Sequence, residues 1–134
     1  MRAGAVLVWL LLPACAGAHE HHAADAALGP YSAAVVAGGL VFVAGQTGVR
    51  RETFADEVDS AIDSVTKYLA RAGLGLADVV SSTVHLTDIA DFAAMNTVYA
   101  RRFPAPYPAR TTVAVKELPG QARIEITVVA ARQR

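Results

Sequence analysis

The residues best suited to chemistry are an arginine and a glutamate near the carboxyl end of the chain. Arg110 follows Pro108-Ala109 at the start of a predicted strand, and Glu125 lies between two isoleucines in the next strand. A fixed guanidinium can hold a carboxylate through two parallel hydrogen bonds. A glutamate held in a strand can take a proton from water. Together the two residues suggest a small site that binds a carboxylate and activates water.

Both residues also have an ordinary structural interpretation, which the local sequence favours. A surface arginine commonly forms an ion pair with a nearby acid, at little gain in stability. Glu125 on an open strand face would be a solvated carboxylate. If that face is buried in an oligomer, the charge needs a partner, and such a setting suits a general base.

Three further residues invite a functional interpretation beside a structural one. Tyr31 begins a predicted strand, where a phenol either bonds a substrate or packs. Gly45 ends the next strand, where a glycine allows a ligand to approach the backbone or marks a bulge. His85 has no acid or serine partner at a recognisable offset, so we expect it to be structural or exposed. The sequence has no nucleophile elbow, phosphate loop or zinc-ligand spacing.

The pattern of apolar residues predicts the elements that position these side chains. Gly38-Gly39 separates two short strands and predicts a hairpin. A helix is predicted between Thr53 as N-cap and Gly73, and a second after Asp91 as N-cap. Strands are predicted at residues 31–37, 40–45, 79–87, 110–115 and 122–131. This order, β-β-α-β-α-β-β, predicts an α+β two-layer sandwich, with a mixed sheet and two helices on one face.

Composition limits the partners of such a domain. The 134 residues include 12 basic and 12 acidic side chains, with no basic stripe, which argues against nucleic acid. Two helices cover only one face of the sheet, and a bare second face is unfavourable in a small domain. We therefore expect a homo-oligomer.

Residues 1–18 have the pattern of a signal peptide. Arg2 precedes the apolar run at residues 5–12, and residues 16–18 form a small-x-small cleavage site. We expect a periplasmic or secreted protein without cysteine, since Cys15 is the only one. An uncleaved anchor is one alternative. Another is lipidation of Cys15, which alone would attach the protein to a membrane, although Pro13 suits a lipobox poorly.

The segment at residues 19–27 is predicted to be disordered, ahead of a folded domain at residues 28–134. It begins His19-Glu20-His21-His22, whose imidazoles could hold a metal ion. A rigid frame to set metal geometry is absent from this Ala-rich stretch, so no metal site is expected.

Six short motifs resemble those of the RidA (YjgF) family of enamine/imine deaminases, and they span residues 28–131. In order along the chain they are Gly29-Pro30-Tyr31-Ser32, Val41-Phe42-Val43-Ala44-Gly45-Gln46, Thr83-Val84-His85-Leu86-Thr87-Asp88, Phe92 to Asn96 with Tyr99, Pro108-Ala109-Arg110-Thr111 and Arg123-Ile124-Glu125-Ile126.

The resemblance implies a chorismate-mutase-like fold and a homotrimer with active sites between subunits, needing no metal or cofactor. It implies hydrolysis of 2-aminoacrylate and related enamines or 2-imino acids to 2-oxo acids and ammonia. By resemblance, Arg110 binds the substrate carboxylate, and Glu125 activates the water, which the backbone carbonyl of Thr112 also holds. Gly45 is a backbone donor to the carboxylate, and Tyr31 lines the cleft.

Several positions depart from the family pattern. Ala44 replaces a common serine, the link after Gln46 is short, and Glu57 and Ser64 replace a glutamine and an asparagine. Export would also separate the protein from cytoplasmic enamines. Two alternatives therefore stay open: a non-catalytic trimer that binds small carboxylates through Arg110, and a structural protein in which Arg110 and Glu125 only link subunits.

Overall fold

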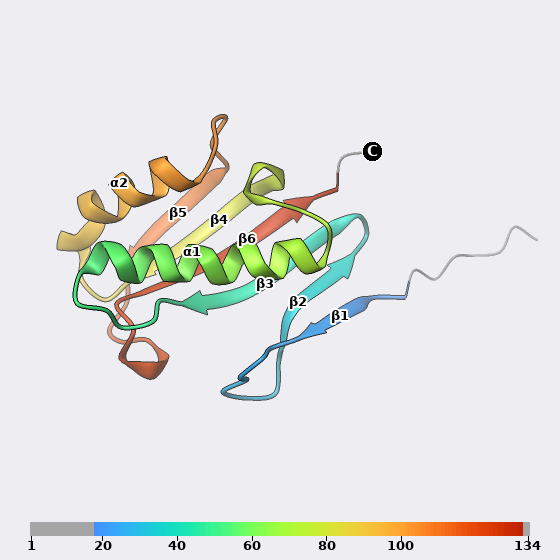
Figure 1. The fold of residues 1–134 in the computed structure, drawn as a ribbon, viewed down its shortest axis with the longest axis horizontal. Coiled ribbons are helices and arrows are strands. Elements are labelled where there is room, and N and C mark those ends of the chain that lie inside the picture. Colours follow the sequence, from blue (N-terminus) through green and yellow to red (C-terminus); the bar gives the residue numbers. More distant parts are fainter. Residues whose placement is uncertain (1–17, 133–134) are drawn as a thin grey trace, which may run out of the picture.

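The fold is one six-stranded sheet with two α-helices on one side of it (Figure 1). A computed structural model describes residues 18–132. Its strands are β1 (Glu20–Ala23), β2 (Ser32–Ala37), β3 (Leu40–Thr47), β4 (Val79–Leu86), β5 (Ala109–Ala114) and β6 (Ile124–Ala131). Its helices are α1 (Phe54–Arg71) and α2 (Phe92–Arg102), with short 3-10 turns η1 (Leu76–Asp78), η2 (Ile89–Asp91) and η3 (Pro119–Gln121). The predicted α+β fold class is confirmed.

The strand order places β6 at the centre of the sheet. The order is β1-β2-β3-β6-β4-β5, and only β4 and β5 run parallel. A parallel pair requires a crossover connection, which α2 provides. The carboxyl-terminal strand therefore contacts both β3 and β4, and β5 forms an edge that carries Arg110.

Helix α1 begins and ends where the sequence predicts. The Thr53 hydroxyl accepts a hydrogen bond from the Asp56 amide at 3.1 Å. Gly73 ends the helix with φ of +76°, a conformation that costs glycine little. The helix has a fully buried apolar face, formed by Val58, Ile62, Val65 and Leu69.

Helix α2 begins differently from the prediction. Asp91 makes no capping hydrogen bond and has helical backbone angles, so its predicted role as N-cap is wrong. Asp88 instead accepts from the Ala90 amide at 2.8 Å and starts η2, which leads into α2. Because η2 runs directly into α2, the capping residue is Asp88, at the start of η2, and not Asp91.

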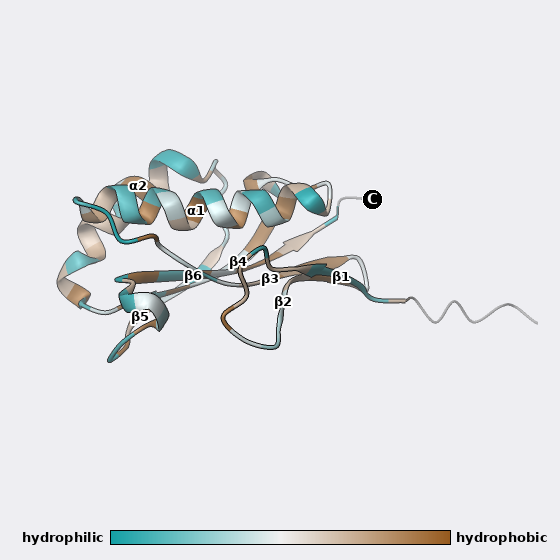
Figure 2. Cartoon of the chain, turned by 60° about the horizontal axis from the view of Figure 1, so that its bottom comes forward, coloured by the Kyte–Doolittle hydropathy of each residue, from teal (hydrophilic) through white to brown (hydrophobic). Residues whose placement is uncertain are grey.

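The helices cover one sheet face, and the other face is open (Figure 2). Side chains alternate between these faces along each strand. Ile124, Ile126 and Val128 of β6 are buried under the helices. The open face carries a row formed by Val35, Phe42 and Val129 on neighbouring strands, and Phe42 is 44% exposed.

The segment predicted to be disordered contains strand β1. Glu20–Ala23 pairs with β2 in antiparallel register, so the prediction of disorder is wrong there. The edge of β2 offers unpaired backbone groups, which an extended segment of almost any composition can satisfy. Asp25 then bonds Lys67 and Arg71 of α1, which fixes the segment to the helix layer.

The histidines of β1 have partners within the protein. His21 Nδ1 lies 3.1 Å from Ser32 Oγ, and His22 lies 3.4 Å from Glu20. Across residues 18–132, no three His, Cys, Asp or Glu side chains are grouped so that they could hold a metal ion. In the same range no helix has the length and apolar character needed to cross a bilayer. Cys15 and residues 1–17 of the predicted signal peptide lie outside the described part.

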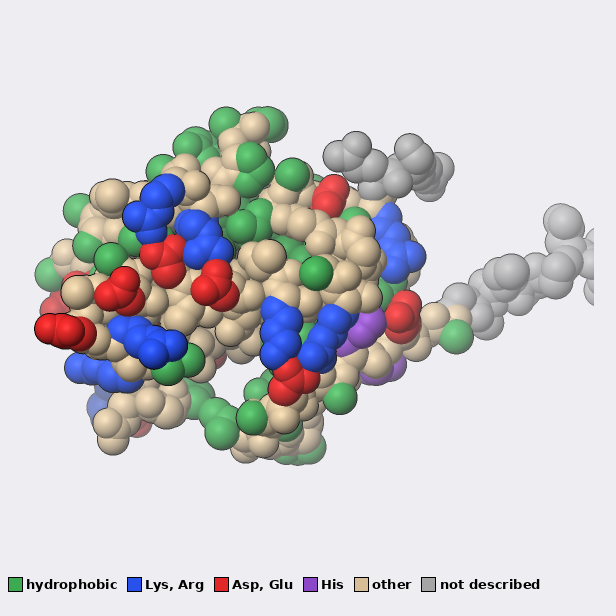
Figure 3. Space-filling view, in the orientation of Figure 1, with side chains coloured by type: hydrophobic (Ala, Val, Ile, Leu, Met, Phe, Trp, Pro, Cys, Tyr) green, Lys and Arg blue, Asp and Glu red, His purple; other side chains and the backbone are tan. Residues whose placement is uncertain are grey.

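Charges of both signs are mixed on the helix layer. Figure 3 shows Lys and Arg side chains beside Asp and Glu side chains over the helices. Arg101 and Arg102 of α2 bond Asp59 of α1, and Arg102 also bonds Asp63. These ion pairs join the two helices, so that the position of α2 over the sheet edge depends on α1.

Candidate active site

Arg110 lies on the helix side of edge strand β5, where α2 fixes its guanidinium. Nη2 donates to Asn96 Oδ1 at 2.6 Å. The guanidinium carbon lies 4.6 Å from the centre of the Tyr99 ring and 5.9 Å from that of Phe92. Such cation–π contacts orient the planar group. Phe92, the first residue of α2, is 40% exposed beside Arg110.

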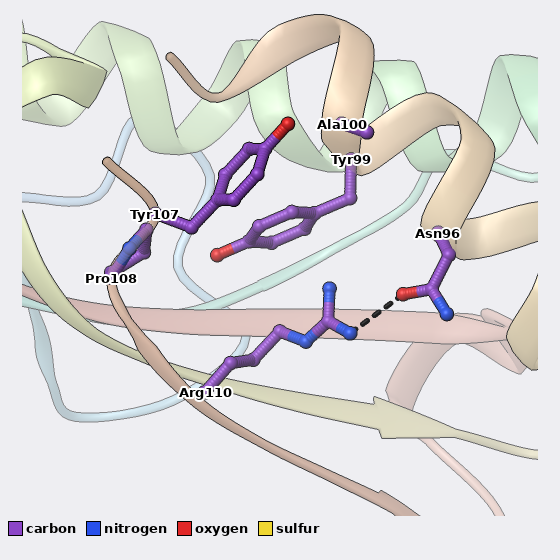
Figure 4. A pocket seen from close by; sticks show the side chains of 6 residues that line it. All are labelled: Asn96, Tyr99, Ala100, Tyr107, Pro108 and Arg110. Carbon is purple, nitrogen blue, oxygen red and sulfur yellow. Dashed lines mark hydrogen bonds between the residues drawn. The ribbon is translucent and has the colours of Figure 1, made fainter. Parts of the chain in front are cut away.

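A pocket of about 370 Å³ opens beside this guanidinium, as Figure 4 shows. It is lined by Asn96, Tyr99, Ala100, Tyr107, Pro108 and Arg110. Within residues 18–132, no acidic side chain lies within ion-pair distance of Arg110, so the interpretation as a surface ion pair is wrong. Asn96 is neutral, and the positive charge stays available to an anion.

Buried hydroxyl groups lie near Arg110 on the helix side of the sheet. Burial raises the pKa of the Tyr99 phenol, although Ser82 and Arg110 act in the opposite direction, so the phenol stays neutral near pH 7. The Oγ atoms of Ser82 and Thr112 are buried without a hydrogen-bond partner in the described residues. Thr112 thus lies on the Arg110 face, but the role of its carbonyl stays a prediction.

Glu125 lies on the open face and lines a second pocket, of about 420 Å³. The pocket is lined by Leu28, Gly29, Tyr31, Ala44, Gly45, Thr47, Pro119 and Glu125. The structure therefore brings together three of the predicted site residues, Tyr31, Gly45 and Glu125. Ala44 also lies here, so the serine that it replaces would have faced this pocket.

Gly45 makes room for the carboxylate of Glu125. A β-bulge interrupts the β3–β6 ladder between Val43 and Gln46, which leaves Gly45 within the irregular stretch. An ideal Cβ on Gly45 would lie 2.5 Å from Cδ of Glu125, closer than carbon atoms pack. The interpretation of Gly45 as a bulge glycine is therefore confirmed, and its role as a backbone donor to a ligand stays a prediction.

His85 contacts Glu125, a contact that sequence reasoning did not find. Its Nδ1 lies 3.2 Å from Glu125 Oε1, and the two residues are direct cross-strand partners in the β4–β6 pair. No acid lies at a recognisable sequence offset from His85, and the acidic partner that the structure supplies is 40 residues away. Alternation in β4 and β6 places both residues on one face, but the register of the two strands is set by long-range packing.

Arg110 and Glu125 do not share a pocket within one chain. Arg110 is opposite Ser82, which is opposite Val128, three residues from Glu125. Two strand spacings of about 4.8 Å and three residues of about 3.3 Å put the two Cα atoms roughly 14 Å apart. Their side chains also leave opposite faces of the sheet. A small carboxylate cannot contact both groups of the same chain.

A buried ion pair supports the strand end next to Glu125. Glu57 of α1 is fully buried and accepts from Arg123 Nε at 2.7 Å and from the Arg123 amide at 2.6 Å. An ideal Cβ on Gly48 would lie 2.5 Å from Cγ of Glu57. Glu57, one of two α1 residues that depart from the family pattern, thus binds the residue that precedes β6.

The fold and the site place this protein among the small α+β two-layer proteins. Its mixed six-stranded sheet carries two helices on one face and has one pocket on each face. Residues 21–132 match the family described as Endoribonuclease L-PSP. RidA from an Antarctic Psychrobacter bacterium superposes with a TM-score of 0.76 at 37% identity, covering 79% of this chain and 91% of that one. The chain belongs to the RidA (YjgF) family.

Two curated relatives carry names that state an activity. Reactive Intermediate Deaminase A, chloroplastic, of Arabidopsis thaliana is 41% identical over 114 residues, which are 80% of this chain and 61% of the plant protein. The chain thus spans about three fifths of that relative. The 2-iminobutanoate/2-iminopropanoate deaminase of Capra hircus is 36% identical over 114 residues, which are 80% of this chain and 83% of the goat protein.

Proposed function

We propose that this protein hydrolyses reactive enamines and 2-imino acids, of the 2-aminoacrylate and 2-iminopropanoate type, to 2-oxo acids and ammonia. The observation that carries the proposal is the guanidinium of Arg110, fixed at a pocket without an acidic partner among the described residues. The names of the plant and goat relatives support the same substrate class.

We propose that each site forms between two copies of the chain, in a homotrimer. Arg110 of one copy would face Glu125 of the next, because the two residues lie on opposite sheet faces of one chain. The apolar row on the open face, in which Phe42 is exposed and Val35 and Val129 are half-buried, supports burial of that face against another copy.

The reaction needs positioning and one base. Arg110 holds the carboxylate of the substrate, which presents the imine carbon C2 to water. Glu125 takes a proton from water as the oxygen bonds C2, and the C=N π electrons move to nitrogen. Glu125 returns that proton to nitrogen, which gives a neutral carbinolamine. The hydroxyl proton then also passes to nitrogen, the C=O bond forms and the C–N bond breaks. Ammonia leaves and a 2-oxo acid remains.

Substitution of the arginine tests the proposal. Arg110→Ala is expected to abolish release of pyruvate from enzymatically generated 2-iminopropanoate. Arg71→Ala is the matched control, because Arg71 pairs with Asp25 at the other end of α1 and lines neither pocket. Equal turnover by Arg110→Ala and wild-type protein would exclude the assigned role.

A binding function without catalysis is the second candidate. The pocket around Arg110 is complete within one chain, with Asn96 and Tyr99 on α2, and does not need Glu125. A protein that binds 2-oxo acids but shows no turnover in wild-type form would favour this candidate. Catalysis that is lost in Glu125→Gln while binding persists would favour the hydrolase.

We also propose export from the cytoplasm. The order of charged, apolar and small residues in residues 1–18 supports it. The mass of the mature protein tests this proposal: a chain that begins at His19 is expected, and an intact amino terminus in the cytoplasm would contradict it.

A further inference from the structure

The carboxylate of Glu125 is confined from two sides. On the β4 side His85 Nδ1 lies 3.2 Å from Oε1. On the β3 side the backbone of Gly45 approaches so closely that a Cβ would lie 2.8 Å from Oε1 and 2.9 Å from Oε2. Glu125 is 20% exposed and His85 is 30% exposed, so both side chains are partly withdrawn from solvent.

The contact with His85 follows from the architecture of the sheet. Glu125 pairs directly with His85 in the antiparallel β4–β6 ladder. Directly opposed residues have Cβ atoms about 5 Å apart on the same face. The pairing of the two strands therefore brings the imidazole and the carboxylate within hydrogen-bond distance.

The chemistry of a base fixes the tautomer of the histidine. Glu125 can take a proton only as a carboxylate, and a carboxylate accepts hydrogen bonds without donating any. A bond between Nδ1 and Oε1 therefore requires the proton on Nδ1 of His85. Oε1 is then engaged, and Oε2 is the oxygen left for water.

No neighbouring charged or titratable group among the described residues competes with His85 for the hydrogen bond to Glu125. Tyr31 lines the same pocket but makes no hydrogen bond to Glu125. Arg123 lies two residues before Glu125 on β6, but its Nε donates to Glu57. From β3, Thr47 is the cross-strand neighbour of Glu125 and carries no charge. In residues 18–132, His85 is the one hydrogen-bond partner of the Glu125 carboxylate.

We propose that His85 is a positioning residue, whose Nδ1–H holds Oε1 of Glu125 and thereby directs Oε2 toward the hydrolytic water. The inference rests on the hydrolase function proposed above. In the step that it assists, a proton passes from water to Oε2 while the oxygen bonds C2. His85 gives up no proton and touches no reacting atom.

Two substitutions separate hydrogen bonding from packing. His85→Leu removes the donor at similar size, and is expected to lower kcat about tenfold to a hundredfold with KM changed less than about twofold. His85→Asn places an amide N–H near the position of Nδ1, and is expected to recover kcat to within about threefold of wild type. Thr83→Val is the matched control, because Thr83 lies two residues earlier on the same face, opposite Thr127.

Each outcome supports or overturns the inference. A normal kcat in His85→Leu overturns it, as does an equal loss in the Leu and Asn variants while Thr83→Val stays active. If His85→Leu does not fold, His85→Thr suits a strand, is too short to reach Glu125, and serves in its place. Wild-type protein without turnover would refute the hydrolase itself, whereas active wild type with active His85→Leu refutes only the role of His85.

Discussion

Arg110 is held by a neutral amide and two aromatic rings. The contacts to Asn96, Tyr99 and Phe92 orient the guanidinium without cancelling its charge. A guanidinium that paired with an acid would have to lose that partner before it bound a substrate. The arrangement therefore favours an anionic ligand. Because Arg110 is on β5 and its partners are on α2, it depends on the packing of α2 against β5.

Gly45 is the residue whose substitution most directly tests the position of the Glu125 carboxylate. Gly45→Ala would place a methyl group 2.5 Å from Cδ of Glu125, and the carboxylate would have to move. A displacement near 1 Å can lower activity by on the order of a hundredfold. We expect this loss in kcat/KM for 2-iminopropanoate, with thermal unfolding little changed, because the end of a glutamate side chain yields easily.

Gly29→Ala provides the control for this prediction. Gly29 lines the same pocket, but a Cβ there would meet no atom within 4 Å. Its activity should match wild type. Equal activity of Gly45→Ala and Gly29→Ala would show that the close approach of Gly45 to Glu125 has no part in catalysis.

At the scale of elements, the ion pairs between α1 and α2 place the Arg110 pocket. Burial opposes the charge of Asp59, but hydrogen bonds from Arg102 and Arg101 outweigh it and lower the pKa of the Asp59 carboxyl. A pKa that is lower in the folded state adds stability above the unfolded value of about 3.9, and this contribution is lost as pH falls through the folded value.

Asp59→Asn is therefore expected to destabilise the protein in a pH-dependent way. Because Asp59 is 26% exposed, the loss in unfolding free energy should be about 1 kcal/mol near pH 7 and should shrink toward pH 3. Urea unfolding at the two pH values measures it. Asp63→Asn is the comparison, with a smaller expected loss, since Asp63 is 69% exposed. A difference in unfolding free energy between Asp59→Asn and wild type that does not change with pH would contradict the lowered pKa of Asp59.

The sequence predicted the helices and strands better than the pairing of the strands and the contacts between distant side chains. Period-two alternation in β6 and the apolar face of α1 give the faces of both elements, because each pattern depends on local geometry. Strand β1 was missed because its pairing uses backbone groups of β2, which no side-chain pattern reports. His85 was missed for a related reason: its partner Glu125 is 40 residues away, and their register is a property of the assembled sheet.

At the scale of the whole molecule, one chain carries two halves of a site. Arg110 faces the helix layer and Glu125 faces the open side, with Cα atoms roughly 14 Å apart by strand geometry. A chain that carries both residues, with an apolar row on the same open face as Glu125, is consistent with closed self-association. The proposed hydrolysis then depends on assembly as much as on either residue.

Subunit mixing tests this central claim most directly. Arg110→Ala and Glu125→Gln chains would be prepared with different tags, tested alone, and then refolded together, with mixed oligomers confirmed by native mass spectrometry. Each parent should be inactive. In an equal mixture about a quarter of the interfaces should combine an intact Arg110 with an intact Glu125, and turnover of 2-iminopropanoate should recover to about that fraction of wild type. Confirmed mixed oligomers that stay as inactive as their parents would contradict a site shared between chains.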